Sequence, residues 1–580
     1  MAFLVSPGVN TSEIDQTTAV PSVGTSTGAT VGVFRWGPAN TLIQVSSESD
    51  LVQQFFEPDL NTAATFISAS NFLAYGNDLR VVRAINSTAG ANCSNNAISN
   101  TSHFVTIAND EDYFNNQYAG ANALVQFSAR FPGSIGNSLK VSVCANAASF
   151  SSWAYASYFD GAPNTSNYAA TTTGNANLKD ELHIIVVDED GAINGTANTV
   201  LERWSNLSKA SDARGDDGSS IYYKEVLYRN SQWVHWIGHG VGSNTTNAWG
   251  QTVATVHASG DKFHQPPVVN YSFVNGADGS VTQANIVNAI NLLNDKEKVD
   301  ISLLFAGDCG VSSNSAINAA DVANQYITIA DVRKDCVAFV SPAYANVVGA
   351  QASATAIVNY RNALTSTSYG VMDSGWKYQY DKYNDIYRYI PLNADIAGLC
   401  VRTDLQRDPW FSPAGLNRGQ IRNLVKLAFN PTQAERDTLY KAGVNPVVSF
   451  PGEGTVLFGD KTLQGRPSAF DRINVRRLFI TLEKAISAAA RSSLFEFNDE
   501  FTRAQFVALV EPFLRDVQGR RGIYDFRVVC DETNNTAGVI DRNEFIGDIY
   551  IKPARSVNFI QLNFVAVRSG VAFDEIVGRF

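Results

Sequence analysis

The character of this 580-residue sequence changes twice along its length. Residues 28–85 and 275–430 carry alternating strand and helix patterns, whereas residues 87–274 are rich in Asn, Ser, Thr and Ala and in turn signals. A chain of this length divides into several domains of about 100–200 residues each. The sequence therefore predicts an α/β body that is interrupted by a projecting, mostly β insertion.

The body shows apolar spacing typical of alternating strands and helices. The predicted strands are residues 30–34, 79–84, 299–305 and 336–340, and the predicted helices are residues 48–55, 63–75 and 321–330. Residues 299–340 thus form a β-α-β unit, which we expect to be right-handed because nearly all such crossovers are.

Residues 431–580 form the last predicted unit, and it begins with an amphipathic helix at 474–490. Asn498 is a candidate N-cap for a second helix, in which Pro512 should bend or end the helix. The side chains expected to face inward from that helix are Phe501, Phe506, Leu509, Phe513 and Leu514. Three strands are predicted to follow, at 523–530, 545–551 and 557–567.

The predicted fold class is therefore a multidomain mixture of α/β and α+β structure. The expected domains are an N-terminal arm at 1–20, a middle α/β domain at 21–86 and 275–430, the insertion at 87–274, and a C-terminal α+β domain at 431–580.

Charge excludes several classes of partner. The net charge is −11, and only 17% of the residues are charged, so we expect no direct binding of nucleic acid or of anionic membrane. The acidity lies in residues 1–430, because residues 431–580 contain 19 basic and 19 acidic side chains. Such an asymmetry favours a C-terminal domain that faces a different partner.

Targeting signals and disulfides are also not expected. The first basic residue is Arg35, and the early apolar run at residues 2–5 is too short for a signal peptide, so the chain should fold in the cytosol. The six cysteines are scattered, which indicates free thiols.

We find no motif for a cofactor or a metal. The chain has no Gly-Lys dipeptide and hence no P-loop. His235 and His239 lack the glutamate of a zinc protease, and the turn at Asp216 lacks the closing glutamate of a calcium loop.

One cluster leaves an enzymatic alternative open. Asp381 and Asp385 lie among tyrosines at 378–389, and paired carboxylates beside aromatic rings are typical of sugar-cleaving enzymes. The alternative is a pair of strands with packed tyrosines and surface ion pairs at Lys377 and Lys382.

Several distinctive segments follow one another along the chain. They are residues 6–9 (SPGV), 34–39 (FRWGPA), 71–84 (NFLAYGNDLRVVRA), 131–139 (FPGSIGNSL), 377–385 (KYQYDKYND), 394–400 (ADIAGLC), 412–415 (SPAG), 445–446 (NP), 471–479 (DRINVRRLF), 495–498 (FEFN) and 530–545 (CDETNNTAGVIDRNEF). In this order they resemble the tail sheath family of contractile phages, closest to the T4-like myophage sheath. The clear gap in the resemblance covers much of 87–274.

The resemblance implies a structural protein and not an enzyme. Its copies would form helical six-fold rings around a tail tube and contract from a metastable extended state, which drives the tube through the host envelope. Other copies, the tube protein, the baseplate and the tail terminator would be its partners. The protein would be part of the virion tail and would assemble in the host cytoplasm, with the C-terminal domain facing the tube and the insertion facing outward.

The resemblance also implies that neighbouring subunits exchange terminal strands. The first twenty residues lack helical periodicity, which fits a strand that pairs with another subunit's sheet. The candidate exchange residues are Val9, Thr11, Glu13, Ile14, Val567, Val571 and Phe573. The candidate tube contacts are Arg515, Arg520 and Arg521, with Arg476 and Arg477 as further basic residues of that domain.

Another self-assembling shell protein, such as a capsid or tube subunit, is the remaining alternative. Tube subunits are usually far shorter, and the large insertion does not suit a small ring.

Overall fold

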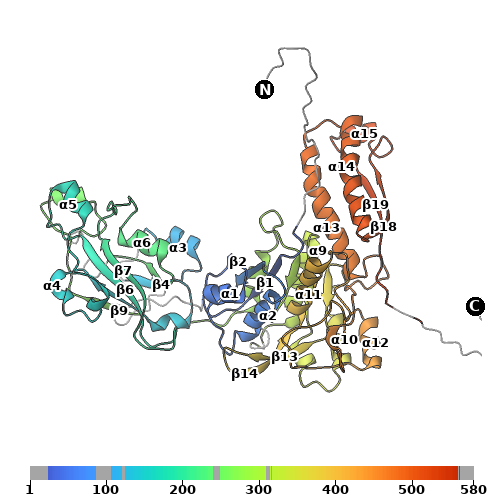
Figure 1. The fold of residues 1–580 in the computed structure, drawn as a ribbon, viewed down its shortest axis with the longest axis horizontal. Coiled ribbons are helices and arrows are strands. Elements are labelled where there is room, and N and C mark those ends of the chain that lie inside the picture. Colours follow the sequence, from blue (N-terminus) through green and yellow to red (C-terminus); the bar gives the residue numbers. More distant parts are fainter. Residues whose placement is uncertain are drawn as a thin grey trace, which may run out of the picture. The chain divides into compact units, whose positions relative to one another are not determined.

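The computed structural model of the chain describes residues 24–86, 106–119, 125–239, 248–308, 314, 316–558 and 561. The described residues fall into two compact units (Figure 1). The larger unit contains residues 24–409 and 413–485, and the smaller unit contains residues 410–412 and those from 486 onward. The boundary between them falls within helix α13 (Ile473–Ala490).

A six-stranded sheet forms the centre of the larger unit, in the order β12-β11-β10-β1-β3-β2. Its strands are β1 (Gly28–Gly32), β2 (Leu42–Val45), β3 (Leu79–Arg83), β10 (Leu303–Phe305), β11 (Val337–Val340) and β12 (Gly370–Met372). All neighbours are parallel except β2 and β3. Most of these residues are buried, as expected for parallel strands covered on both faces.

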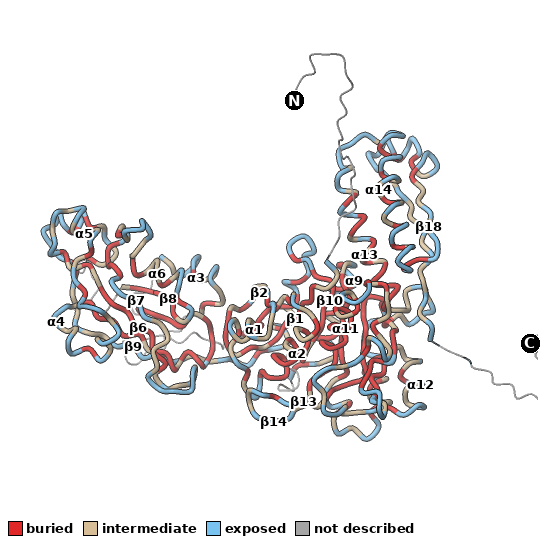
Figure 2. Tube along the Cα trace, viewed as in Figure 1, coloured by how far each residue is buried: buried red, intermediate tan, exposed pale blue. Residues whose placement is uncertain are grey.

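Helices cover both faces of this sheet and complete the main core (Figure 2, red). One group, α2 and α11, packs together against strands that include β1 and β10. The other group, α8 and α9, also packs together, with α8 against β1 and β3 and α9 against β10, β11 and β12. The helices of this body are α1 (Glu48–Phe55), α2 (Ala63–Leu73), α8 (Gln283–Asn291), α9 (Ala319–Arg333), α10 (Ser353–Asn362), α11 (Asn393–Gln406) and α12 (Gln433–Lys441). The three predicted helices of the body are confirmed, with ends that differ by at most a few residues.

Two smaller sheets complete the body. They contain β13 (Trp376–Asp381), β14 (Ile386–Pro391) and β15 (Lys426–Leu427), and then β16 (Val447–Phe450) and β17 (Gly454–Leu457). Val447, Leu457, Leu463 and Ile473 belong to the main core. Residues 431–485 therefore belong to the larger unit, which differs from the expected domain that starts at 431. Charge composition cannot reveal which core an apolar hairpin joins.

The insertion contains sheets and helices. Its strands are β4 (Phe127–Ala129), β5 (Leu139–Cys144), β6 (Glu181–Asp188), β7 (Thr199–Ser208), β8 (Val234–Trp236) and β9 (Val269–Ser272). The ribbon β4-β8 and the sheet β7-β6-β5-β9 share one apolar cluster. The strand predicted at 182–187 lies inside β6.

The expectation of a mostly β insertion needs correction, because short helices surround these sheets. They are α3 (Asp110–Asn116), α4 (Ala147–Phe150), α5 (Asn167–Thr173), α6 (Tyr223–Asn230) and α7 (Val253–Ala258). Asn109, Ser166 and Thr252 cap three of them by accepting hydrogen bonds from main-chain N–H groups. The same residue types were interpreted as turn signals, and they also start helices.

The smaller unit consists of the end of α13, then α14 (Glu500–Gly519), β18 (Ile523–Val529), α15 (Ala537–Ile540) and β19 (Asp548–Pro553). Asp499, not Asn498, is the N-cap of α14 and accepts from the Thr502 N–H at 2.8 Å. Of the two predicted effects of Pro512, a bend or an end of the helix, the end is wrong, because α14 continues to Gly519. Pro512 lies on the exposed side, while Val510 and Leu514 anchor the helix from the buried side. Of the third predicted strand, Val557 and Asn558 are not in a strand, and most other positions lie outside the described residues.

Candidate subunit-interaction surfaces

The smaller unit contains an open two-stranded sheet. Strands β18 and β19 pair antiparallel with each other, and among the described residues no further strand extends their sheet. Helix α14 packs against β18, while Tyr524 and Tyr550 are exposed. Two strands alone are marginally stable, and an unpaired edge is a template for another strand. The candidate exchange residues Val9, Thr11, Glu13, Ile14, Val567, Val571 and Phe573 all lie outside the described residues.

The three candidate tube contacts lie at the C-terminal end of α14. Arg515, Arg520 and Arg521 are all exposed. Two of them form loose ion pairs at 3.5 Å, with Glu511 and Asp516 of the same helix. Exposed pairs of this kind contribute little stability. The arginines are therefore accessible to a partner.

Arg476 and Arg477 do not belong with that group. Arg477 is buried and forms an ion pair with Asp404 at 2.6 Å. Arg476 is also buried, where it donates to Ser368 Oγ at 2.7 Å and lies 4.0 Å from the ring centre of Phe470. Both side chains hold the larger unit together, so they are removed from the candidate tube contacts.

The carboxylates of the enzymatic alternative serve the β13–β14 turn instead. Asp381 accepts from the Tyr383 N–H at 3.0 Å and lies 2.9 Å from Nε of Arg388. Asp385 accepts from the Tyr380 hydroxyl at 2.6 Å. Both carboxylates have structural partners, so the cluster does not provide a free acid–base pair.

Lys377 corrects another expectation, because its ammonium is buried rather than paired at the surface. It donates to Asp395 at 2.9 Å, and Tyr75 donates to the same carboxylate oxygen at 3.2 Å. Burial raises the pKa of Asp395 and lowers that of Lys377. Nearby, burial raises the pKa of Asp373 to about 7. Perturbed groups often mark functional sites, but these are enclosed in the core. Lys382 does form an exposed pair, with Glu48 at 3.1 Å.

The two histidines have separate partners. The His235 ring stacks on Tyr113 with centroids 3.9 Å apart, whereas His239 Nδ1 lies 2.7 Å from the Tyr223 hydroxyl. Within the described residues, no three His, Cys, Asp or Glu side chains come together as a metal-binding group would require.

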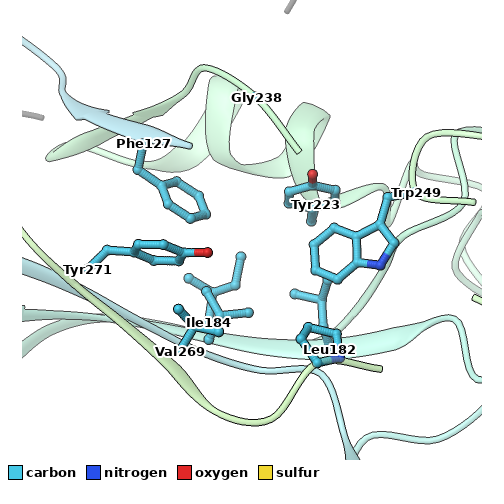
Figure 3. Close-up of a pocket in the computed structure, with 10 residues that line it drawn as sticks. Phe127, Leu182, Ile184, Tyr223, Gly238, Trp249, Val269 and Tyr271 are labelled. Carbon is cyan, nitrogen blue, oxygen red and sulfur yellow. The ribbon is translucent and has the colours of Figure 1, made fainter. Parts of the chain in front are cut away.

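A small aromatic cavity lies between the sheets of the insertion (Figure 3). Phe127 and Tyr271 face each other on one side, and Tyr223 and Trp249 lie on the other. Its volume is about 40 Å³, room for little more than one water molecule. Ligand pockets usually measure about 300–1,000 Å³, so this cavity is a packing feature.

An exposed group of apolar side chains was missed from the sequence. Leu494, Phe495, Phe497 and Phe501 lie at the start of α14, with exposures of 63%, 105%, 83% and 75%. The prediction that Phe501 faces inward is wrong, whereas Phe506 and Leu514 are buried as predicted. The sequence did contain a signal for this exposed group. Large apolar residues are dense in the loop between two predicted helices, and the acidic residues Glu496 and Asp499 lie among them.

Among the described residues, no helix is both long enough and apolar enough to span a membrane.

Three family models match the chain. They describe the N-terminal region of tail sheath protein domain III at residues 25–84, the phage tail sheath central domain at 279–463, and the phage tail sheath C-terminal domain at 466–566. The tail sheath protein of Vibrio phage KVP40 is 35% identical, over 99% of this chain and all of that protein. The tail sheath protein of Enterobacteria phage T4 is 34% identical, over 99% of each chain.

Solved structures show the same fold at lower identity. A sheath tail protein from Listeria innocua matches with a TM-score of 0.51 and 10% identity, over 92% of this chain and 93% of that one. The helical sheath of the anti-feeding prophage in its contracted state matches with a TM-score of 0.50 and 13% identity, over 97% and 99%.

Proposed function

Because this chain belongs to the family of contractile phage tail sheath proteins, we propose that its copies are joined by exchanged strands. The protein is a structural subunit of a contractile tail sheath in the virion and not an enzyme. Residues 1–20 and the tail beyond Val567 supply strands to the smaller unit of neighbouring copies.

The edges of the β18–β19 sheet, with which no other strand of the described residues pairs, support this proposal most directly. An added strand forms directional main-chain hydrogen bonds at a free edge, while the connecting segment can still bend. Copies joined in this way can change their relative position without separating.

The proposed assembly is a stack of six-fold rings around a tail tube, formed in the host cytoplasm. The smaller unit lies innermost, the insertion faces outward, and the baseplate and tail terminator bind the ends. The extended array is metastable. Burial of about 300 Å² more apolar surface per subunit would favour contraction by at most about 7 kcal/mol.

Removing the N-terminal arm tests the exchange. Deletion of residues 1–15 should leave a folded monomer that does not polymerise, as measured by sedimentation velocity and negative-stain microscopy. The point variant Val9→Lys/Ile14→Lys should reproduce the defect, because charges replace the apolar side chains of the strand, whereas Thr11→Ser should assemble normally. Long sheaths from the truncated protein would contradict strand exchange.

The tube contact is tested separately. Arg520→Glu/Arg521→Glu should prevent co-assembly with the tube protein, because it reverses two exposed charges at the end of α14. Lys441→Glu, which reverses an exposed charge on α12, is the control. Normal co-assembly of the arginine variant would remove both residues from the contact.

A further inference from the structure

The described residues of the smaller unit leave an apolar surface uncovered. We call Leu494, Phe495, Phe497 and Phe501 the aromatic tip. Its three phenylalanine side chains present roughly 500 Å² of surface, because a whole side chain offers about 200 Å². A patch of that size is at the upper end for a monomer and indicates an interaction site. Figure 2 shows this end of α14 as exposed.

Side-chain hydrogen bonds to the neighbouring loop hold the tip in place. Asn498 donates to Asn535 at 3.2 Å and to the Glu544 carbonyl at 2.8 Å, and Arg503 donates to Asn498 at 2.9 Å. Asn535 is buried and donates to the Ile546 carbonyl at 2.7 Å. Phe495 has a φ of 71°, which is strained for a bulky residue. A strained and anchored backbone that presents apolar rings to water is typical of a recognition element.

The two ends of α14 carry opposite charge. Around the aromatic tip the exposed acidic residues are Glu496, Asp499, Glu500, Asp531, Glu532, Asp541 and Glu544, against Arg491 and Arg542. At the other end lies a group that we call the basic end, formed by Arg515, Arg520, Arg521, Lys552 and Arg555. Asp516, Asp525 and Glu511, which pairs with Arg515, lie among them, so the five basic side chains outnumber three acidic ones.

Main-chain bonding brings the members of the basic end together. The Ala554 N–H donates to the Gly522 carbonyl at 3.1 Å, and Lys552 pairs with Asp525 across the two strands. The helix dipole favours acids at the start of α14 and bases at its end. It does not account for the exposed phenylalanines, nor for the charges in the loops.

We infer that the aromatic tip of one copy binds the basic end of the smaller unit in a second copy. Acidic side chains around the tip meet basic ones at the other end, and arginine side chains stack on the phenylalanine rings. One such contact is present within the smaller unit, where the Arg520 guanidinium lies 5.4 Å from the Trp410 ring centre.

The occupant is a second copy because the two surfaces cannot meet within one chain. A rigid 20-residue helix separates them by about 30 Å. A contact between two different surfaces of identical subunits is heterologous, and it generates rings or open helical arrays rather than closed pairs. The inference rests on the proposed function, since it presupposes a self-assembling sheath subunit, and it adds a contact that does not depend on exchanged strands.

The test measures self-association of the purified full-length chain without tube, by sedimentation velocity, with hydrogen exchange as the check on folding. Phe495→Ser/Phe497→Ser should raise the concentration needed for assembly by about tenfold or more, because it removes the centre of the contact. The matched control, Val332→Ser/Leu405→Ser, replaces two apolar residues of the larger unit that are also exposed and should assemble normally.

Charge reversal identifies the partner surface, and it uses two residues of the basic end that are not candidate tube contacts. Glu496→Arg/Glu532→Arg and Lys552→Glu/Arg555→Glu should each weaken assembly, and the four substitutions together should restore it, because complementary charges then meet again. Failure of the combined variant to recover would overturn the pairing. Normal assembly of Phe495→Ser/Phe497→Ser in the absence of tube would also overturn the inference. The same holds if that variant assembles normally and loses only its binding to the tube. Failure of strand exchange is recognised independently, through assembly of the chain that lacks residues 1–15.

Discussion

In the larger unit six strands form one sheet covered on both faces, whereas the sheet of the smaller unit has two strands, among the described residues. The first buries most of its strand residues, while the second leaves Tyr524 and Tyr550 exposed. The large sheet supplies its own stabilisation through apolar burial. The small sheet has little to bury, so under the proposed strand exchange we expect strands from other chains to add to its stability.

The comparison separates a rigid body from an assembly element. A sheath must keep its subunits intact while their contacts change, and a large core meets the first requirement. Open strand edges and exposed rings meet the second. Three substitutions, in order of decreasing effect, test whether the two units differ in this way.

The largest effect is expected from a cavity in the central sheet. Phe305 is fully buried and stacks on Phe72 with centroids 5.1 Å apart. Phe305→Ala should lower the unfolding free energy of the larger unit by about 3–5 kcal/mol, measured by denaturant unfolding. Phe506→Ala in the smaller unit should cost about 2 kcal/mol, since its neighbour Phe545 is partly exposed and the site can close. Equal costs would contradict the distinction between the units.

The second effect concerns pH. Burial raises the pKa of Asp373 to about 7, whereas main-chain and hydroxyl hydrogen bonds lower the pKa of exposed Asp499 and Asp531 in the smaller unit. Between about pH 4 and pH 7 the folded state keeps the Asp373 proton that the unfolded chain has lost, so stability of the larger unit falls as pH rises.

Asp373→Asn should remove this slope. It should stabilise the larger unit at pH 7 by up to about 4 kcal/mol relative to the wild type, an upper bound from the size of the shift. Denaturant unfolding across this pH range measures it. Asp295→Asn, at an exposed site of the same unit, should keep the wild-type slope. An unchanged slope in the Asp373 variant would show that another group is responsible.

The smallest effect is local to the smaller unit. Asn535→Ala removes the acceptor of the Ile546 N–H at 2.9 Å and the donor to its carbonyl. Ile546 is half-buried, so the loss of both hydrogen bonds should cost about 1–3 kcal/mol in total, from about 0.5–1.5 kcal/mol for each. Hydrogen exchange should show the loss in α14 and β19 and not in the central sheet. Asn543→Gly, at an exposed site with a φ of 58°, should be neutral.

Parts of the fold could be predicted from local pattern alone. Helix α1 and strand β3 were found because apolar spacing over a few residues decides them. Pro512 was misjudged because packing of Val510 and Leu514 outweighs one missing main-chain hydrogen bond. Lys377 and Phe501 were misplaced since whether a side chain is buried depends on elements far away in the sequence, such as Asp395 on α11.

The interaction surfaces also combine features that the sequence predicts with features that only the fold decides. The sequence predicted Arg515, Arg520 and Arg521 as tube contacts together with Arg476 and Arg477. Only the fold separated the two groups, because it buries Arg476 and Arg477. The aromatic tip lies within a segment that carries the family resemblance, residues 495–498, and its exposure could not be inferred from apolar residue types, which usually indicate a core.

The amino-acid sequence by itself determined the family, the alternation of strands and helices in the body, and the acidic and neutral parts of the chain. These properties depend on residue type and short-range spacing. The tertiary structure decided where the compact units divide, which charges are buried, and which apolar side chains remain in water. Those outcomes depend on contacts between residues hundreds of positions apart, and no local sequence pattern determines the energy of such contacts.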